Sequence, residues 1–375
     1  MESRTFFAAQ RPPLDRRGFL RFAGVGGAAV GGGLLLAACS SGSDTGSGST
    51  AAASGGAASY GTIALQLSWI KNVEFAGEYF ATDKGYYTDA GFDAVTLLAG
   101  GGQTGAEEAL LAGQADIGIS SVAITGPSVA KGATLKIIGS TYQKNPFCLL
   151  SLEEGNPIRT IADVKGKKIG VQSGGNSTIF AGFLKANGLT ADDVTLVTTQ
   201  YDISPLEKGK YDAHMSYTTN EPILAAADGY TPVTLDLADN GLPFVAETFT
   251  VTEDTLSSKR DMLKAFLVAE IKGWTDAIND SAGGAKLAVT EFGKDQDLDV
   301  KEQTKEAKAA NALMVTADVN KNGLFTMTDE LIAENVKTMG LMGTTITADL
   351  FDMSLLKEIY QDNPDLIASF TVPAE

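Results

Sequence analysis

LQLSWIKNVEFAGEYFATDKGYYTDAGFD, residues 65–93, contains a strand, a loop and a helix in that order. Ile63, Leu65 and Leu67 alternate with polar or small residues, which is the pattern of a strand with one buried face. The alternation breaks at Ser68, and a helical periodicity starts near residue 73 and stops at Gly85. This order predicts an α/β unit whose first loop follows the carboxyl end of a strand.

The loop between this strand and this helix is a candidate ligand site. It carries Trp69, Lys71, Asn72, Glu74 and Phe75 within seven positions. In open α/β sheets, ligands bind outside the carboxyl ends of the strands. Two aromatic rings beside an amide and a carboxylate suit a flat ligand with polar edges. The alternative is that both aromatic residues simply pack in the core.

The N-terminal residues resemble an export address. Residues 15–21, DRRGFLR, are similar to a twin-arginine signal, and an apolar run at 22–38 follows. LAAC at 36–39 resembles a bacterial lipobox, which implies cleavage before Cys39 and its lipidation. Residues 39–59 then have the Ser/Gly/Ala composition of a flexible tether. We therefore expect a protein that is exported and lipid-anchored on the outer face of the cytoplasmic membrane, or periplasmic.

Composition excludes several classes of partner. Without residues 1–38 the chain keeps 24 basic and 44 acidic residues, a net charge of −20, which repels nucleic acid and anionic lipid. Cys148 would be the one cysteine besides Cys39, so it is expected to be a buried apolar residue. A single histidine, His214, makes a transition-metal centre improbable, and no cofactor is expected.

A faint internal repeat predicts two related lobes. Residues 110–120 and 206–216 both fit L-x-x-G-x-x-D-x-x-x-S, and the upstream segments 94–98 and 193–197 also correspond. Chance similarity of helix, turn and strand signals is the alternative. We expect lobe 1 at 60–154 plus 244–375 and lobe 2 at 155–243, joined by hinge strands at 147–152 and 244–252. The C-terminal part of lobe 1 is predicted to be helical at 260–279, 284–292, 301–315, 328–339 and 353–360.

Several motifs resemble one known family. They are W-x-x-N-x-x-x-A-G-x-Y-x-A from Trp69, K-G-Y-Y at 84–87, A-G-Q-A-D-I-G at 112–118, D-V-K-G-K-K-I-G-V at 163–171, G-x-x-D-A at 209–213 and N-E-P at 220–222. They are similar to solute-binding proteins of ABC importers that handle thiamine-pyrimidine precursors, riboflavin, nitrate, sulfonates and taurine. The resemblance implies a periplasmic-binding-protein-like (type II) α/β fold, with two lobes joined by two hinge strands around a ligand cleft. It also implies a monomer that serves membrane permease subunits.

The family uses loops that follow strands to bind ligand, and this pattern implies a set of candidate residues. They are Trp69, Asn72, Phe75, Glu78, Gln103, Thr104, Ser120, Ser121, Ser173, Gly174, Gly175, Asn176, Ser177, Tyr201, Asp202, Tyr217, Asn220 and Glu221. Glycines at 174–175 let a ligand approach the backbone and the next helix N-terminus. An ordinary strand-to-helix turn is the alternative for each glycine loop.

Charge in these loops favours one ligand class. Glu74, Glu78, Asp202 and Glu221 face a single basic residue, Lys71. Sulfonate or nitrate would call for arginine, lysine or exposed amides, so an aromatic heterocycle, such as a thiamine-precursor pyrimidine or a riboflavin-like ring, is preferred. Sulfonate, taurine or nitrate remains the alternative ligand. Glu74 and Glu78 share a helix face and repel each other, so one of the two is expected to face solvent.

Other classes of function were weighed. A pyrimidine-synthase-like enzyme would carry a cysteine-rich motif, which is absent, so the protein is expected not to be an enzyme. An interaction-only lipoprotein is a further alternative. A weak calcium candidate matches part of an EF-hand loop at Asp318, Asn320, Asn322 and Asp329. Its alternative is a polar connection in which Thr328 caps the following helix.

Overall fold

The computed structural model describes residues 59–101 and 105–371, which belong to one compact unit, 56–375. The predicted export signal, Cys39 and the tether lie outside the described residues, as do Gln103 and Thr104. No helix in the described ranges has the length and apolarity needed to cross a membrane.

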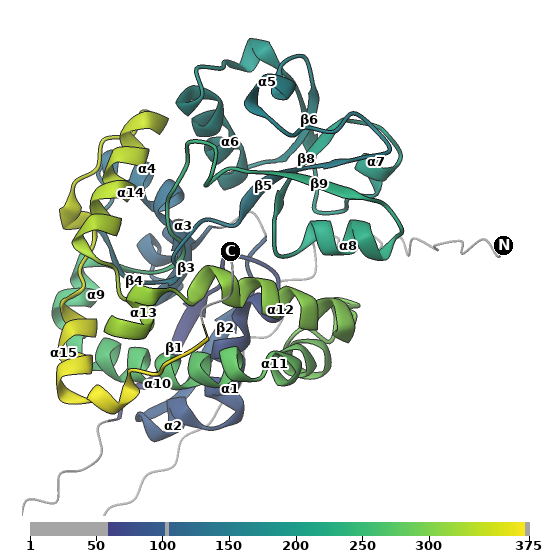
Figure 1. The fold of residues 1–375 in the computed structure, drawn as a ribbon. Helices are drawn as coiled ribbons and strands as arrows, with labels where there is room; N and C mark the ends of the chain where they lie inside the picture. Colours follow the sequence, from purple (N-terminus) through teal and green to yellow (C-terminus); the bar gives the residue numbers. More distant parts are fainter. Residues whose placement is uncertain (1–58, 102–104, 372–375) are drawn as a thin grey trace, which may run out of the picture. The chain divides into compact units, whose positions relative to one another are not determined.

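Two five-stranded mixed sheets organise the described residues (Figure 1). The first has the order β2-β1-β3-β10-β4, with bounds Phe92–Leu98, Gly61–Gln66, Ile117–Ser121, Ala246–Thr252 and Leu135–Tyr142. The second has the order β7-β6-β8-β5-β9, with bounds Thr195–Thr199, Lys168–Gln172, Ala213–Tyr217, Phe147–Leu152 and Pro232–Asp236. In each sheet the first three strands run parallel, and the fourth is antiparallel to both of its neighbours. The predicted α/β class with two lobes is confirmed.

The predicted internal repeat is confirmed by the equal strand orders. Its two copies lead into β3 and β8, which hold the same third place in their sheets. Asp116 accepts a hydrogen bond from the backbone N–H of Ala64 in β1, and Asp212 accepts one from Lys168 in β6. Each repeated aspartate therefore fastens the start of the third strand of its sheet to the second strand, which explains why the pattern requires it.

The first crossing between the sheets differs from the prediction. The predicted boundary at 154 places β5 in lobe 1, whereas β5 pairs with β8 and β9 in the second sheet. Every residue of β5 is buried, so the strand needs a partner on each side, and the second lobe supplies both. The chain therefore crosses at 143–146 and returns at 237–245, and the strands predicted as hinges belong wholly to one sheet each.

Most helices surround the first sheet and the connection to the second. They are α1 Ala76–Asp83, α2 Tyr86–Asp89, α3 Ala106–Leu111, α4 Val122–Ala130, α9 Glu253–Ser258, α10 Arg260–Asn279, α11 Ser281–Leu287, α12 Val300–Met314, α13 Ala317–Asn322, α14 Asp329–Met342 and α15 Ser354–Asp362. The second lobe holds α5 Ile161–Val164, α6 Gly175–Ala186, α7 Ser204–Glu207 and α8 Glu221–Ala227. Short 3₁₀-helical turns lie at Val73–Phe75, Ala191–Asp193, Ala348–Leu350 and Pro364–Leu366, and a π-helical segment, Ala288–Phe292, follows α11. All five predicted C-terminal helices are confirmed to within a few residues.

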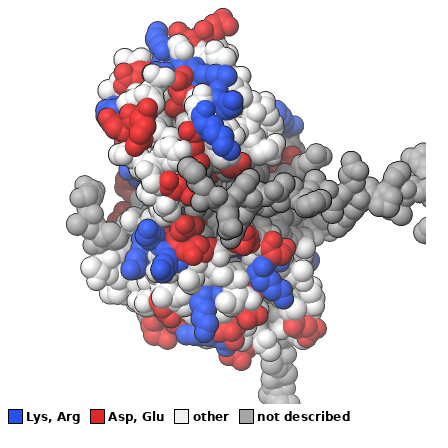
Figure 2. Space-filling view, turned by 90° about the vertical axis from the view of Figure 1, so that its right-hand side faces the viewer, with Lys and Arg blue, Asp and Glu red and all other residues white. Residues whose placement is uncertain are grey.

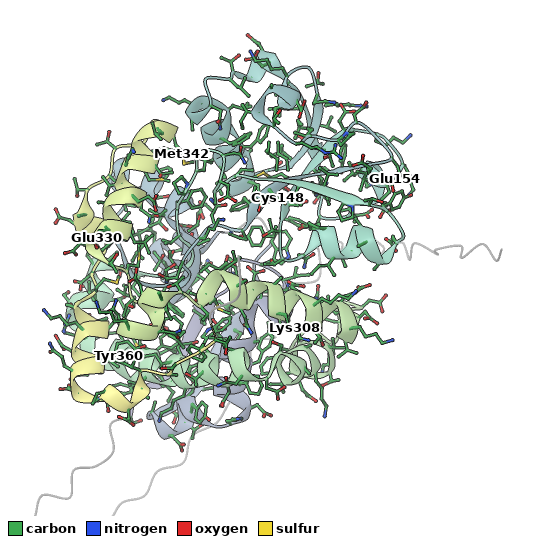
Figure 3. The ribbon with its side chains drawn as sticks, viewed as in Figure 1. Cys148, Glu154, Lys308, Glu330, Met342 and Tyr360 are labelled. Carbon is green, nitrogen blue, oxygen red and sulfur yellow. The ribbon has the colours of Figure 1, made fainter. Side chains whose placement is uncertain are left out.

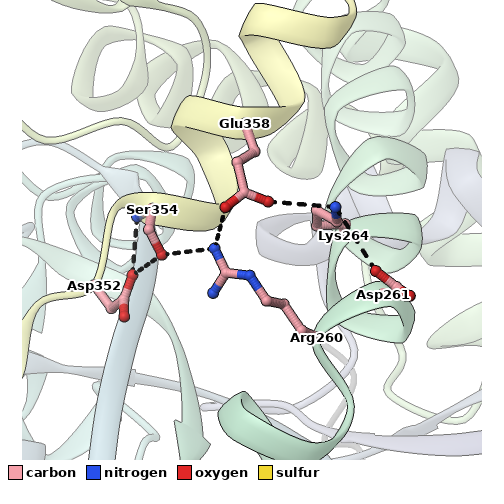
Figure 4. Close-up of polar contacts among 6 residues, drawn as sticks. All are labelled: Arg260, Asp261, Lys264, Asp352, Ser354 and Glu358. Carbon is pink, nitrogen blue, oxygen red and sulfur yellow. Dashed lines mark hydrogen bonds and ion pairs between the residues drawn. The ribbon is translucent and has the colours of Figure 1, made fainter.

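Contacts between helices hold the C-terminal part of the chain in place. Arg260 of α10 donates to Ser354 Oγ at 2.9 Å and to Glu358 of α15, which Lys264 also reaches (Figure 4). Helix α14 packs against α4 and against α6 of the second lobe. In Figure 3, Met342 at the end of α14 lies beside the second lobe, whereas Tyr360 lies in α15 at the lower left, where α15 packs against α10. The C-terminal helices thus contact both lobes.

The structure contradicts the calcium candidate. Residues 317–322 form the helix α13, so Asp318, Asn320 and Asn322 do not lie on a ligand loop. Both side-chain atoms of Asn320 bond the backbone of Phe370, and Thr328 caps α14, as the alternative expected. Within the described ranges, no group of three or more His, Cys, Asp and Glu side chains is arranged to hold a metal.

Candidate ligand-binding site

A cavity of about 250 Å³ lies where the carboxyl ends of strands from both sheets meet. Its wall includes the loop after β1, the end of β3, the loop after β6, Tyr201 after β7 and the end of β8. The parallel strands of each sheet bring these loops to one edge, which is where α/β folds place ligands. The predicted residues that line the cavity are Trp69, Ser120, Ser121, Ser173, Gly174, Gly175, Asn176, Tyr201, Tyr217, Asn220 and Glu221.

Aromatic side chains from both lobes face this cavity. Trp69 and Tyr201 lie almost perpendicular with ring centroids 3.7 Å apart, and the Tyr201 hydroxyl donates to the Gly101 carbonyl at 3.3 Å. Tyr217 packs edge-on against Phe147. Trp69 is only partly buried, so it is available to a ligand, and the alternative of a purely core position holds for Phe75 alone.

The glycine loop after β6 brings the second lobe close to the first. Gly174 has φ 86°, a backbone conformation that favours glycine, and α6 begins at the next residue. A Cβ on Gly175 would stand 2.6 Å from Ile124 of α4. Asn176 donates to Gln172 at 2.9 Å, which holds the loop at the cavity wall. Gly174 thus supplies the positive φ of this loop, and Gly175 allows its close contact with Ile124 of the first lobe.

Five predicted ligand residues do not line the cavity. Asn72 is buried and caps the turn Val73–Phe75, while Phe75 is part of the first core. Asp202 accepts hydrogen bonds from Ser204 at the start of α7, and Ser177 donates back to Gly174 and faces the outer side of α6. Local capping and helix rotation, which motif spacing does not reveal, turn these side chains away.

Glu78 is the fifth predicted residue that does not line the cavity. The expectation that either Glu74 or Glu78 faces solvent is also wrong. Neither Glu74 nor Glu78 faces solvent, since their exposed fractions are 4% and 1%. Glu74 lines the cavity, whereas Glu78 lies between α1 and α10, close to Trp274 and Glu270. Burial raises the pKa of Glu78 to about 8, so the carboxyl group is mostly protonated, and therefore uncharged, at neutral pH.

Glu247 is the main cavity residue that the sequence reasoning missed. It lies in β10 at φ 50°, between Ala246 and Thr248, and pairs with neither neighbouring strand. This β-bulge turns its carboxylate into the cavity, where Ser68 donates to it at 2.6 Å and Tyr217 at 3.3 Å. No motif marks the position, because the bulge arises from pairing with strands more than a hundred residues away.

Glu74 and Glu247 face each other within hydrogen-bonding reach. Burial, together with the neighbouring carboxylates of Glu247 and Glu306, raises the pKa of Glu74 well above its usual range. Burial raises the pKa of Glu247 to about 7, while the hydrogen bonds from Ser68, Glu74 and Tyr217 oppose that rise. The pair therefore favours one proton, which stays on Glu74 and forms a hydrogen bond to the carboxylate of Glu247.

Three more carboxyl groups line the cavity, those of Glu107, Glu108 and Glu221. Glu221 accepts a hydrogen bond from the Tyr217 backbone N–H, and burial raises its pKa to about 7. Glu107 accepts hydrogen bonds from Ser120 and Thr125, both at 2.6 Å. Glu107 and Gln172 were also missed by the sequence reasoning, although Glu107 lies only a few residues after a predicted loop. Among the described lining residues none is Lys, Arg or His, so Lys71 does not balance this charge.

Glu306 of α12 ties the lobes together behind the cavity. It accepts a hydrogen bond from Asn72 of the first lobe at 2.8 Å and one from Asn220 of the second at 2.9 Å. Gln303 donates to it at 2.7 Å. Asn72 thus acts through Glu306 rather than at the cavity wall, and burial raises the pKa of Glu306 to about 8.

His214 and Cys148, whose side chains could take part in catalysis, lie in the core and do not line the cavity. His214 is fully buried in β8 between Tyr211 and Gln172, and burial lowers its pKa to about 4. Cys148 is buried in β5, as predicted, and burial raises the pKa of its thiol (Figure 3). On the outer face drawn in Figure 2, acidic and basic side chains are interspersed over the described surface. The described cavity lining differs from that face, because it carries carboxyl groups and no basic side chain.

Comparison with solved structures identifies the fold. The chain resembles the alkanesulfonate-binding protein SsuA from Xanthomonas axonopodis pv. citri, with a TM-score of 0.59 and 16% identity, over 78% of this chain and 97% of that one. It also resembles a Candida albicans protein described as having the generic periplasmic binding protein fold, with a TM-score of 0.57 and 14% identity over 80% and 95% of the two chains. The desulfurization enzyme DSZB gives a TM-score of 0.52 and 16% identity over 80% and 99%. The protein therefore has the periplasmic-binding-protein fold.

Sequence comparison identifies the family. The chain matches the family described as NMT1/THI5 like over residues 72–282, more than half of its length, and it belongs to that family. It is 25% identical over 226 residues to the riboflavin-binding protein RibY of Chloroflexus aurantiacus. This match covers 58% of the chain and 62% of the relative, so the chain spans less than two thirds of the relative's length. The predicted family resemblance is confirmed.

Proposed function

We propose that this protein is the extracytoplasmic solute-binding component of an ABC importer and captures a small aromatic heterocycle by closure of its lobes. The observation that carries the proposal is the cavity wall, which combines Trp69, Tyr201 and Tyr217 with five carboxyl groups and no basic side chain in the described lining. Aromatic rings stack on a flat ligand, and carboxylates accept hydrogen bonds from ring amines. A thiamine-precursor pyrimidine or a riboflavin-like ring has both features. The name of the relative RibY supports this ligand class.

A sulfonate, taurine or nitrate is the alternative ligand. The likeness to an alkanesulfonate-binding protein favours it, but that likeness concerns the fold. An anion would lie among Glu74, Glu221 and Glu247, where like charges repel it and no described basic group compensates. The heterocycle therefore remains the preferred ligand.

Two other classes are less well supported. For an enzyme, the fold neighbour DSZB is the favouring observation, yet Cys148 and His214 are buried away from the cavity wall. An interaction-only lipoprotein would leave the polar cavity unexplained. We therefore propose a binding protein without catalytic activity, held to the membrane through Cys39 and delivering its ligand to permease subunits as a monomer.

Tryptophan fluorescence and thermal unfolding test the proposal together. The chain has two tryptophans, Trp69 at the cavity and Trp274 in the first core. A panel of aminopyrimidines, riboflavin, taurine, alkanesulfonates and nitrate is added to the protein, and both signals are followed. A ligand at about a hundred times its dissociation constant stabilises the folded state by about 2.7 kcal/mol. We expect a heterocycle to stabilise the protein and to change the Trp69 emission.

The variant Trp69→Phe provides the control. It retains a ring in the loop and leaves Trp274 as a reference fluorophore, so the ligand-induced emission change is expected to disappear while the core signal stays. A response to sulfonates or nitrate alone would contradict the heterocycle and keep the binding role. A panel without any response would contradict the proposed function.

A further inference from the structure

The carboxyl groups of Glu74 and Glu247 form a pair that lacks a counter-charge. Glu247 is satisfied by Ser68 and Tyr217, whereas Oε1 of Glu74 is buried and has no hydrogen-bond partner in the described part of the chain. Ser121 Oγ, on the same cavity wall, also has no partner there. A buried acceptor without a donor is costly, so these atoms indicate where a ligand donates hydrogen bonds.

Further titratable groups surround the pair. The carboxyl groups are Glu78 on α1, Glu107 and Glu108 on α3, Glu221 on α8 and Glu306 on α12, and the hydroxyl groups are those of Tyr79 on α1, Tyr142 on β4 and Tyr217 on β8. No described cation lines the cavity. Two carboxyl groups in such surroundings keep one proton between them, because both cannot be ionised at hydrogen-bonding distance without a positive charge.

We propose that the ligand carries a positively charged nitrogen group, such as an amidinium or a protonated amino-heterocycle, which Glu74 and Glu247 receive together. The inference rests on the proposed function and names the charge of the ligand. As the cation enters, Glu74 releases its proton to solvent, so that one positive charge replaces one proton and the pair becomes doubly ionised. A planar N–C–N fork can then donate to one oxygen of each carboxylate. The aromatic rings of Trp69 and Tyr201 favour the same cation through their π faces.

Benzamidine and its uncharged isostere benzamide test the proposal. Benzamidine remains cationic throughout the pH range used, so any pH dependence of its binding comes from the protein. Calorimetric titration at about pH 6, 7 and 8 is expected to show benzamidine binding at least tenfold more tightly than benzamide. Its affinity should rise by up to about tenfold per pH unit, because one proton is released per molecule bound. Titrations in two buffers of different ionisation enthalpy count that proton directly.

The variant Glu74→Gln fixes the pair in its protonated form. The amide can still donate to Glu247, but it cannot release a proton. We expect the benzamidine affinity to fall at least tenfold and its pH dependence to weaken sharply, while benzamide binding stays unchanged. Glu302→Gln is the matched control, because it makes the same substitution at a carboxyl of α12 that neither lines the cavity nor faces the pair. It should bind both probes as the unaltered protein does.

Three outcomes would overturn the inference. Equal binding of the two probes without proton release would show that charge is not recognised. Unchanged affinity and pH dependence in Glu74→Gln would remove the pair from recognition. Failure of benzamidine to bind, while an uncharged heterocycle of the panel does, would contradict the cation and leave the importer role standing. The absence of binding by every compound would instead contradict the proposed function.

Discussion

Glu247 holds a backbone conformation that L-residues rarely adopt. Its φ of 50° lies in the left-handed region, inside a strand that pairs with β3 and β4 on its two sides. Such strain costs about 1–3 kcal/mol and persists only where the surroundings impose it. Here β3 and β4 hold β10 on both sides, and the unpaired residue is turned toward the cavity. The strained residue thus supplies the carboxylate that faces Glu74.

Replacing Glu247 by glycine or alanine tests this strain. In an ordinary strand, alanine is more stable than glycine by about 0.5–1 kcal/mol. At Glu247 we expect the reverse, with Glu247→Gly more stable than Glu247→Ala by about 1 kcal/mol, because only glycine tolerates the positive φ. Denaturant unfolding of both variants measures the difference. Greater stability of the alanine variant would contradict a strained bulge at this position.

The packing of α1 against α10 depends on two facing glycines. A Cβ on Gly273 would overlap the carbonyl oxygen of Gly77, and a Cβ on Gly77 would overlap the ring of Trp274. Gly77 belongs to the A-G pair of the motif that begins at Trp69. The motif therefore serves two purposes. Trp69 lines the cavity, and Gly77 lets α1 pack against α10, which orients the loop that precedes α1.

Gly273→Ala is expected to destabilise the protein by about 1–3 kcal/mol, because the added methyl forces the two helices apart. Gly340→Ala in α14 is the matched control. Its Cβ would meet no atom within 4 Å, so the substitution should be neutral or stabilise by up to about 1 kcal/mol. Thermal unfolding compares the two, and similar effects would refute the close-packed crossing.

Helix α12 links the lobes through one side chain. Glu306 bonds Asn72 and Asn220, yet it does not line the cavity. We expect Glu306→Ala to weaken binding of a ligand that the panel identifies by about tenfold, since the hydrogen-bonded link from Asn72 through Glu306 to Asn220 of the second lobe is lost. Glu302→Ala, one turn earlier on α12 and less buried, should leave affinity unchanged. Calorimetry distinguishes them, and equal affinities in the two variants would show that this link does not matter for binding.

At the scale of the whole molecule, buried carboxyl groups determine how stability depends on pH. Burial raises the pKa of Glu221 and Glu247 to about 7 and that of Glu78 and Glu306 to about 8. Unfolded glutamate titrates near about 4.3, so the folded state binds protons more tightly than the unfolded state. The stability from these groups is complete below that value and is lost as pH rises through about 8.

We therefore expect the melting temperature of the ligand-free protein to fall between about pH 5 and pH 8. Below about pH 4 stability is lost for the opposite reason, because hydrogen bonds lower the pKa of the surface residues Asp163, Asp193 and Asp299. Glu306→Gln should flatten the alkaline part of the profile by removing one of the four buried groups. Scanning calorimetry across this range provides the measurement, and a melting temperature that rises up to pH 8 would contradict the buried carboxyl cluster.

Much of the architecture follows from local patterns. Arg260 and Asn279 bound the predicted and the observed α10, because its apolar periodicity and its ends are encoded within one helix. The strand 147–152 was found by its apolar run, but its sheet was not, since apolarity shows that a strand is buried and not which neighbours it has. The glycine and aspartate of each repeat marked equivalent third strands, because each acts within one unit.

The cavity shows the same division. The sequence by itself determined that loops after parallel strands carry Trp69, the 173–176 turn, Tyr217 and Glu221, since strand ends and turn glycines are local features. Only the tertiary structure decided that Phe75 and Glu78 turn inward, that Asn72 reaches Glu306, and that Glu247 faces Glu74. These relations join residues of separate elements, up to 234 positions apart. Their distances and protonation arise from packing and desolvation, which exist only once the chain has folded.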